Sequence, residues 1–387
     1  MPDDASSPIF PETAGTTESA GQTIDDSAGR IFPCESCGAD LKFHIGQQVL
    51  KCPFCQFEKE IVLADDARIE EQDFHGMLAH LEQLHNEEQQ PADEQHDYNE
   101  VRCESCGANV VFVGSLTSSE CAYCGSPIQL DSVRLAIRRI PVDAVLPFLT
   151  TREQARENLE RWVKSRWFAP NEFRRRGADG KFNGVYLPYW TFDSLTFNNY
   201  SGERGEHYYV TVGSGKNKRR ERRTRWYPAS GSFQRFFDDV LVAATKDLPR
   251  KLLRGLEPWP LGHCVPANQE MLAGHLARTY ETGLEGGFET AKARIDETID
   301  SDVRSRIGGD TQRVHSIQSR YDAITFKHLL LPTWLLAYRY QKKTYQVIVN
   351  AATGEVQGER PYSWIKITCA VLAALAAVGI AVIASKS

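Results

Sequence analysis

The heptapeptides CESCGAD at Cys34–Asp40 and CESCGAN at Cys103–Asn109 are near-copies of one motif within a chain of 387 residues. Each opens a set of four cysteines arranged as two C-x2-C pairs. The first set is Cys34, Cys37, Cys52 and Cys55, and the second is Cys103, Cys106, Cys121 and Cys124. Fourteen residues separate the inner cysteines of each set, and a constant shift of 69 superposes the sets without a gap. The chain therefore contains an internal duplication.

The spacing C-x2-C-x14-C-x2-C is typical of a four-cysteine zinc site. Two tight turns, each offering two thiolates, supply a tetrahedron of sulfurs around one ion. Gly38, Gly107 and Gly125 follow the second cysteine of a pair, where the turn favours a positive φ, and Gln56 stands at the fourth such place. The segments between the pairs read as strand, turn, strand. We predict two zinc ribbons holding two structural Zn²⁺ ions, with no open coordination position for catalysis.

Two other uses of the cysteines remain open. Four disulfides would suit an exported protein, whereas the absence of an N-terminal charged and apolar leader favours a reducing compartment. A redox role for C-x2-C would require a thioredoxin-like βαβ pattern, and none is recognisable around these pairs.

Charge is distributed unevenly along the chain. The overall net charge of −6 is the sum of about −17 for residues 1–100 and +11 for the remainder. A basic body of this kind could face an anionic partner, or it could carry an ordinary solvated surface.

We expect an α+β fold with six segments. They are a disordered acidic N-terminus at 1–30, a first zinc ribbon at 31–63, an acidic linker with a short helix at 64–100, a second zinc ribbon at 101–130, an α+β body at 131–363 and a transmembrane tail anchor at 364–385. Apolar residues at helical spacing from Phe74 to Leu84 predict the helix in the linker.

Within the body, residues 151–168 predict a helix with Thr150 or Thr151 as its N-cap. Residues 267–305 predict a second helical stretch, broken near Gly286–Gly287. Aromatic-rich strands are expected from 184 to 202 and a basic hairpin from 206 to 231. A strand meander with an ATGE turn is expected from 328 to 358.

A weaker repeat lies inside these strands. Leu187, Pro188 and Trp190 match Leu331, Pro332 and Trp334 as two L-P-x-W motifs. The two copies could form a ligand platform, but the interpretation that we favour is a duplicated antiparallel meander with tryptophans in its core.

The segment 216–225, KNKRRERRTR, has seven basic residues in ten. It could bind phosphates of lipid or nucleic acid, and it could equally be solvated charge that blocks edge pairing. The segment shows no interleaved aromatic residues of the kind that stack on single-stranded bases. GSGK at 213–216 lacks the spacing and the following helix of a phosphate-binding loop. We find no catalytic motif and expect no enzymatic activity.

The C-terminal stretch 367–384 has 18 residues without a charge, about 27 Å as a helix. Trp364, Lys366 and Lys386 suit the two interfaces of a membrane. Basic residues are more numerous before this stretch than after it, which favours an N-terminal domain on the cytoplasmic side. Ala373, Ala377 and Ala381 recur every four residues and could allow homo-oligomers through the tail.

Several phrases resemble a family of bacterial tail-anchored zinc-ribbon membrane proteins, often labelled primosomal protein N′ (replication factor Y)-like helicases or TFIIB-type zinc-ribbon proteins. They are LPYWTFDSLTFNNYSGERG, RWYPASGSFQRFFDDVLVAAT, IGGDTQRV, TFKHLLLPTWLLAYRYQKKTYQVIVNAATGEVQGERPYS and the paired CESCG turns. The resemblance runs from residue 31 to the tail. It implies zinc at all eight paired cysteines, a single-pass anchor in the bacterial inner membrane, and neighbours of the SPFH and phage-shock types. The chain has no Walker motif to support the helicase label.

These observations lead to two expected functions. The first is a membrane-tethered zinc-ribbon adaptor that presents both ribbons to a cytoplasmic protein partner. The second is a nucleic-acid-binding protein held at the membrane. The acidic surroundings of the ribbons favour the adaptor, because phosphate binding requires positive potential.

Overall fold

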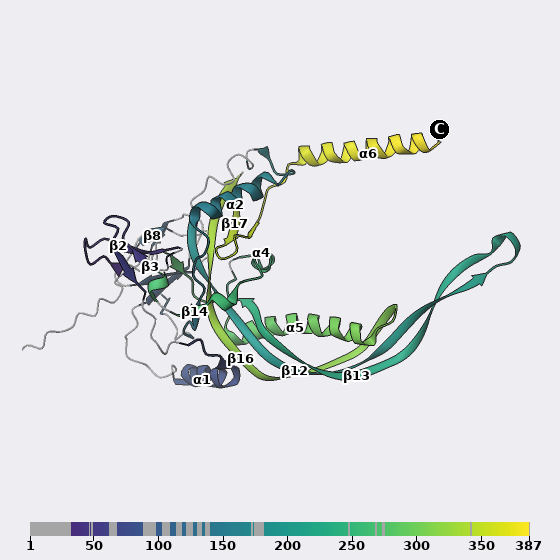
Figure 1. Ribbon diagram of the computed structural model, residues 1–387, viewed down its shortest axis with the longest axis horizontal. Helices are drawn as coiled ribbons and strands as arrows, with labels where there is room; N and C mark the ends of the chain where they lie inside the picture. The colour runs from purple at the N-terminus through teal and green to yellow at the C-terminus, as the bar shows by residue number, and fades with distance from the viewer. Residues whose placement is uncertain are drawn as a thin grey trace, which may run out of the picture.

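Two long antiparallel strands form the centre of the body: β12 (Phe182–Val212) and β16 (Thr311–Tyr340) (Figure 1). Leu187 lies opposite Leu331, so the two L-P-x-W motifs meet across this pair. Outside β12 lies β13 (Arg219–Ala243), and outside β16 lies β17 (Lys343–Asn350). The α+β class expected from the sequence is confirmed.

The structure is a computed structural model. It describes residues 32–45, 47, 49–61, 68–87, 98–102, 109–113, 118–120, 127–129, 134–135, 140–171, 173, 182–246, 248–267, 269–272, 275–340 and 343–386. The acidic N-terminus 1–30, expected to be disordered, lies outside these residues.

The two halves of the body repeat one order of elements: a short strand, a helix and a long hairpin. The first half has β11 (Ala144–Val145) and α2 (Arg152–Lys164) before β12 and β13. The second has β15 (Leu276–Ala277) and α5 (Leu284–Ile307) before β16 and β17. Each short strand pairs parallel with the long strand of the other half, β11 with β16 and β15 with β12. The halves are therefore interlocked at their start.

Equivalent tryptophans fix the beginning of the two helices. The indole Nε1 of Trp190 donates to the carbonyl of Thr282, and that of Trp334 to the carbonyl of Thr150, each at 2.9 Å. Each carbonyl lies two residues before its helix. Both tryptophans are buried. They belong to the core, as the favoured interpretation of the repeat expected.

The first helix begins as the sequence predicts. Thr151 is the N-cap of α2, and its hydroxyl accepts a hydrogen bond from the backbone N–H of Gln154. The Gln154 side chain accepts the N–H of Thr151 in return, at 2.9 Å, which completes a capping box.

The expected break of the second helix is wrong. Helix α5 begins at Leu284 and continues through Gly286 and Gly287. A Cβ on Gly287 would lie 2.7 Å from Cδ1 of Trp190, so the absence of a side chain allows the helix to approach the sheet closely. Further along, α5 covers the sheet with a buried stripe that ends at Ile307 (Figure 1). The glycine pair is a packing device rather than a helix breaker.

Gly287→Ala should therefore lower the free energy of unfolding by about 1–3 kcal/mol, because the added methyl group overpacks the core at Trp190. Gly286→Ala is the matched control. The nearest atom to its Cβ is Thr282 Cγ2 at 3.4 Å, so this variant should be neutral or stabilising by up to about 1 kcal/mol. Denaturant unfolding of both variants measures the difference, and equal effects would contradict this packing.

Strands in the cysteine-rich region preserve the duplication. The first set is β1 (Phe32–Pro33), β2 (Asp40–His44), β3 (Val49–Lys51) and β4 (Glu58–Glu60). The second is β6 (Tyr98–Arg102), β7 (Asn109–Val113), β8 (Ser118–Glu120) and β9 (Pro127–Gln129). Strands β7, β8 and β9 begin and end 69 residues after β2, β3 and β4. Strand β6 pairs with β7 and β8 with β9, as β1 pairs with β2 and β3 with β4. Among the described residues, the pairing of β2 with β3 has no counterpart in the second set.

The helix predicted in the linker is α1 (Phe74–Glu87), and it packs on the body. Just before it, β5 (Gln72–Asp73) pairs with β16. Phe74 is buried, with its ring 4.7 Å from that of Phe288. This part of the linker is thus attached to the sheet.

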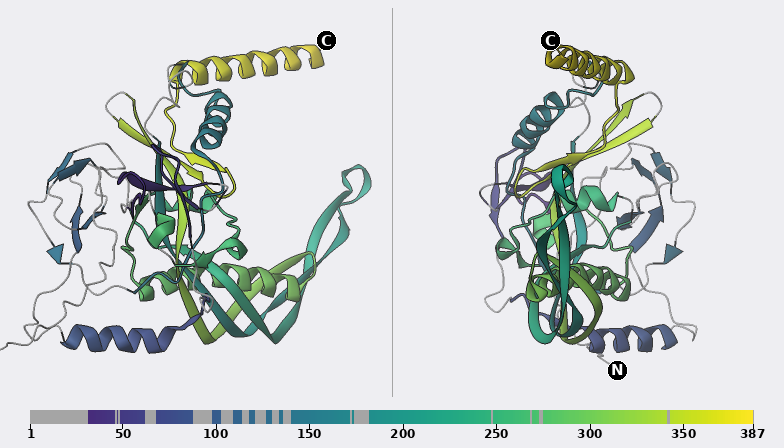
Figure 2. Two further views of the ribbon diagram at one scale, coloured as in Figure 1. Left: turned by 60° about the vertical axis from the view of Figure 1, so that its left-hand side comes forward. Right: turned by 90° about the vertical axis from the view of Figure 1, so that its right-hand side faces the viewer.

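The basic hairpin projects from the body as a two-stranded arm (Figures 1 and 2). Pairing of β12 with β16 ends at Gly205, whereas pairing of β12 with β13 continues to Val212. We call residues 206–225 the arm. GSGK lies at its tip, where the 3-10 turn Gly215–Asn217 leads into strand β13 rather than into the helix that a phosphate-binding loop requires.

Shorter elements complete the fold. They are β10 (Arg134–Leu135), α4 (Arg250–Gly255), the 3-10 turns Leu261–His263 and Gln269–Leu272, β14 (Val265–Pro266) and β18 (Val356–Gly358). The predicted ATGE turn joins β17 to β18, with Gly354 at φ 79°.

Helix α6 (Trp364–Lys386) extends from one extreme of the molecule (Figures 1 and 2). Judged on the side chains that the structure describes, no helix is both long and apolar enough to cross a membrane. The side chains of residues 380–387, which include the end of the predicted span, lie outside the described part. The tail anchor stays a prediction.

Candidate metal centre

Two similar turns carry the first four cysteines. The N–H of Gly38 donates to the carbonyl of Cys34 at 2.8 Å, and that of Gln56 to the carbonyl of Cys52 at 3.1 Å. Gly38 has φ 73° and Gln56 has φ 63°. The positive φ expected after each second cysteine is therefore present in both turns, even where glutamine replaces glycine.

The four sulfurs of Cys34, Cys37, Cys52 and Cys55 converge, all within 4.8 Å of one another. Cys34 Sγ lies 3.5 Å from Cys55 Sγ, and Cys37 Sγ lies 3.5 Å from Cys52 Sγ. A tetrahedron with Zn–S bonds of about 2.3 Å has sulfurs about 3.8 Å apart, whereas a disulfide bond measures about 2.05 Å. The geometry fits a metal ion such as zinc and contradicts disulfides among these four residues.

Backbone donors adapt one thiol to act as a ligand. The N–H of Cys55, with a smaller contribution from that of Phe54, lowers the pKa of Cys52 to about 6, although burial opposes this shift. A thiolate is the form that binds zinc. Cys34 and Cys52 are buried, whereas Cys37 and Cys55 are exposed, so the site lies half within its ribbon and half at the surface.

The ribbon that holds this site shares its core with the body. Leu41, Phe43 and Leu50 of the ribbon belong to the same buried cluster as Phe148 and Trp334. A small ribbon cannot bury enough apolar surface alone, and here the body covers one of its faces. The sequence predicts residues 31–63 as a separate segment, but the structure places this segment against the body.

The second cysteine set, Cys103, Cys106, Cys121 and Cys124, lies outside the described residues. Its zinc ion stays a prediction. The strands on either side of these cysteines are described and follow the spacing of the first ribbon.

An acidic cluster that sequence analysis missed lies where β5 joins the sheet. Asp193, Asp238 and Asp239 bring their carboxylates within 4.8 Å of one another. The Lys327 ammonium lies 2.9 Å from Asp239 and 3.3 Å from Glu71, so the cluster contains its own cation. Burial, followed by the neighbouring Glu71 carboxyl, raises the pKa of Asp193 to about 7. We interpret the cluster as a set of charged contacts that holds the segment before α1 against the sheet.

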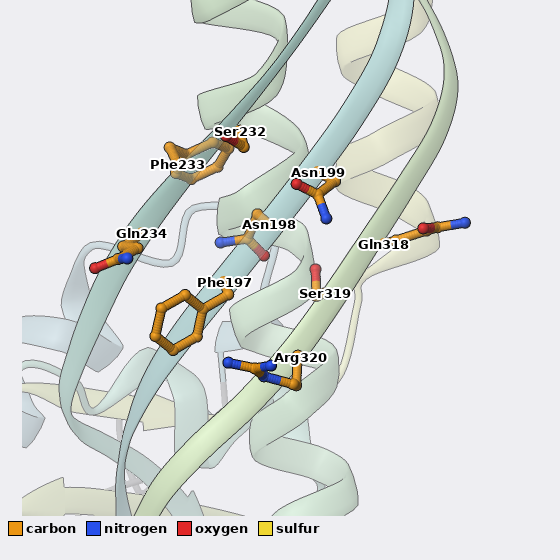
Figure 3. A pocket seen from close by; sticks show the side chains of 9 residues that line it. All are labelled: Phe197, Asn198, Asn199, Ser232, Phe233, Gln234, Gln318, Ser319 and Arg320. Carbon is orange, nitrogen blue, oxygen red and sulfur yellow. The ribbon is translucent and has the colours of Figure 1, made fainter.

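A shallow hollow of about 600 Å³ crosses strands β12, β13 and β16 (Figure 3). The Arg320 guanidinium carbon lies 4.6 Å from the centre of the Phe197 ring, and the other polar groups are amides and hydroxyls. This lining offers no cluster of titratable groups for catalysis. Its residues are Phe197, Asn198, Asn199, Ser232, Phe233, Gln234, Gln318, Ser319 and Arg320.

Comparison with known proteins gives one distant similarity. The chain is 24% identical over 228 residues to a Bacillus subtilis (strain 168) protein printed as "Uncharacterized protein YdjG". The alignment covers 57% of this chain and 63% of the relative, so the chain spans less than two thirds of that protein's length. No protein-family model matches the chain, and no solved structure matches it. The site therefore has to be interpreted from its own chemistry.

Cys52→Ser should remove the zinc of the first ribbon, because three thiolates no longer complete the tetrahedron. The body should also lose about 2–5 kcal/mol of stability, comparable with one large core truncation, since the ribbon packs on it. Zinc content per chain by elemental mass spectrometry and denaturant unfolding measure both effects. Cys264→Ser, which changes a cysteine outside the cluster, is the control. An unchanged zinc content in Cys52→Ser would contradict this site.

Proposed function

We propose that the protein is a non-enzymatic, membrane-tethered adaptor whose zinc ribbons bind a cytoplasmic protein partner. The observation that carries this proposal is Phe54, which lies between Cys52 and Cys55 with 79% of its surface exposed. A large apolar side chain held on a metal-stabilised turn is suited to insertion into a pocket of a partner. SPFH-type and phage-shock-type membrane proteins, implied by the sequence resemblance, are the first partners to test.

Helix α6 supports the tether. Most of its described apolar side chains are exposed, from Ile365 at 77% to Val378 at 61%. An apolar helix without protein contacts on these residues is stable in an apolar solvent such as lipid. In Figure 1 the first ribbon lies on the body away from the free end of α6, so a bilayer around the helix leaves the ribbon accessible.

Full-length protein should resist carbonate extraction from bacterial membranes, and a chain ending after Ser363 should move to the soluble fraction.

Phe54→Ala should abolish co-purification of the partner from detergent-solubilised membranes without changing zinc content or membrane retention. Phe236→Ala, which removes a phenylalanine that is 58% exposed on the sheet, is the control. Retention of the same partner by Phe54→Ala would refute the ribbon as the docking site.

A second function, nucleic-acid binding, is favoured by the arm. Tyr209 of β12 is opposite Arg222 of β13, and the Arg220 guanidinium carbon lies 5.0 Å from the centre of the Tyr209 ring. The segment 216–225 has no aromatic residue of its own, but the neighbouring strand places Tyr209 beside its arginines. Arginine and tyrosine on one surface are typical of single-strand binding.

The two faces of the arm differ in charge. We call the face with Tyr209, Arg220 and Arg222 the open face. Both acidic residues of the arm, Glu206 and Glu221, lie on the opposite face. There they pair with arginines: Glu221 lies 3.6 Å from Arg223, and Glu206 lies 3.2 Å from Arg204 just below the arm. The open face therefore offers arginines without acidic neighbours on the arm.

The double variant Arg220→Ala/Arg222→Ala should weaken binding of a single-stranded oligonucleotide and reduce the slope of log K against log salt by about 1.4. Arg223→Ala/Arg225→Ala removes the same charge from the opposite face and should change the slope less. Fluorescence anisotropy over a salt series measures both. Equal losses in the two variants would contradict a face-specific site, and binding to anionic vesicles alone would assign the arm to lipid.

A further inference from the structure

The start of α6 contacts residues 167–169, which follow the end of α2 and lie about two hundred residues earlier in the chain. The Lys366 ammonium donates to the carbonyls of Trp167 at 3.2 Å and Ala169 at 2.8 Å. The backbone N–H of Ser363 donates to the carbonyl of Phe168 at 2.8 Å. These contacts hold the two segments side by side.

Large aromatic residues from the two segments are exposed at this junction. Trp167 is 73% exposed and Phe168 41%, while Tyr362 is 57% and Trp364 80% exposed. Single exposed aromatic residues are ordinary, but four on two segments joined by hydrogen bonds concentrate exposed apolar surface at one junction. We call these four residues the collar.

Cations accompany the collar. The guanidinium carbon of Arg360 lies 5.3 Å from the centre of the Tyr362 ring, and Arg166 lies within electrostatic reach of both residues. Glu355 is the acidic group that acts on Arg166. Within the described part of the chain, no ion pair includes Arg166, Arg360 or Lys366. The patch is therefore both aromatic and positively charged.

We infer that the collar contacts the headgroup region of an anionic lipid bilayer, with its rings at the membrane interface and its cations on lipid phosphates. This inference rests on the proposed tether and adds the surface by which the body meets the membrane. Tryptophan and tyrosine beside arginine and lysine, at the root of an apolar helix, have the chemistry of an interfacial belt. Trp167 and Phe168 would join the belt although they lie far from α6 in sequence.

The position of the collar is compatible with a bilayer. Figures 1 and 2 show α6 and the end of α2 at one extreme of the molecule, with the first ribbon and α1 lower in the body. A membrane that lies along α6 at this extreme reaches the collar without covering the ribbon, whereas a bilayer crossed by α6 in this orientation would also contain the arm, which projects in the same direction (Figures 1 and 2). The alternative occupants, a second copy of the chain or another protein, are outcomes of the test below.

The test uses full-length protein in nanodiscs of three parts phosphatidylcholine to one part phosphatidylglycerol, with nitroxide labels at the headgroup or at the middle of the acyl chain. Headgroup nitroxide should quench tryptophan fluorescence, and Trp167→Phe should reduce the quenched fraction. Quenching of Trp167 should be roughly twofold stronger from the headgroup than from the acyl label, and stronger with phosphatidylglycerol than without it. Trp226→Phe, which removes a tryptophan next to the base of the arm, is the control.

The outcomes separate the collar from the tether. If the protein incorporates into nanodiscs but Trp167→Phe leaves headgroup quenching unchanged, the collar is refuted and the tether stands. If the protein does not incorporate at all, both fail. If Trp167 is shielded equally in detergent and the chain self-associates there, the collar is a contact between copies and the lipid inference is wrong.

Discussion

The antiparallel register between β12 and β16 is the constraint on which the rest of the molecule depends. Leu187 lies opposite Leu331, and a proline follows each of these leucines in its strand. Proline cannot donate to a ladder, yet its carbonyl can accept. The carbonyl of Pro188 accepts from Ala244 at 2.9 Å, and that of Pro332 from Ala351 at 3.0 Å. This register places both indoles under the starts of their helices, and the outer strands and the arm extend from it.

The metal centre shows how much local sequence can specify. The cysteine spacing and the residues after each pair predict the turns, the converging thiolates and the strands of the first ribbon. They can do so because all of these features depend on contacts within about thirty residues of the chain. The docking of that ribbon on Phe148 and Trp334 depends on contacts between distant segments. From sequence alone, the apolar residues Leu41, Phe43 and Leu50 fit equally well as the core of a ribbon that folds by itself. Sequence spacing alone does not distinguish these two arrangements.

The errors made from sequence have the same origin. Gly286 and Gly287 resemble a helix break because glycine lowers helix propensity, and only the nearness of Trp190 shows why they are tolerated. Of the collar, the sequence analysis singled out Trp364, with Lys366 beside it. Trp167 follows a helix whose sequence gives no reason to associate it with the tail. The aromatic residues of the arm were overlooked because they are on the strand opposite the basic segment.

The exchange of short strands between the halves bears on how this chain arose and folds. Strand β11 completes the second half and β15 completes the first, so neither half is a finished folding unit. Two separate copies of one half could satisfy the same pairings by associating about a two-fold axis. This connectivity is the one that fusion of two associated copies of one half would give. Its folding has to wait until both halves have been synthesised, because the central pairing joins strands that are more than one hundred residues apart.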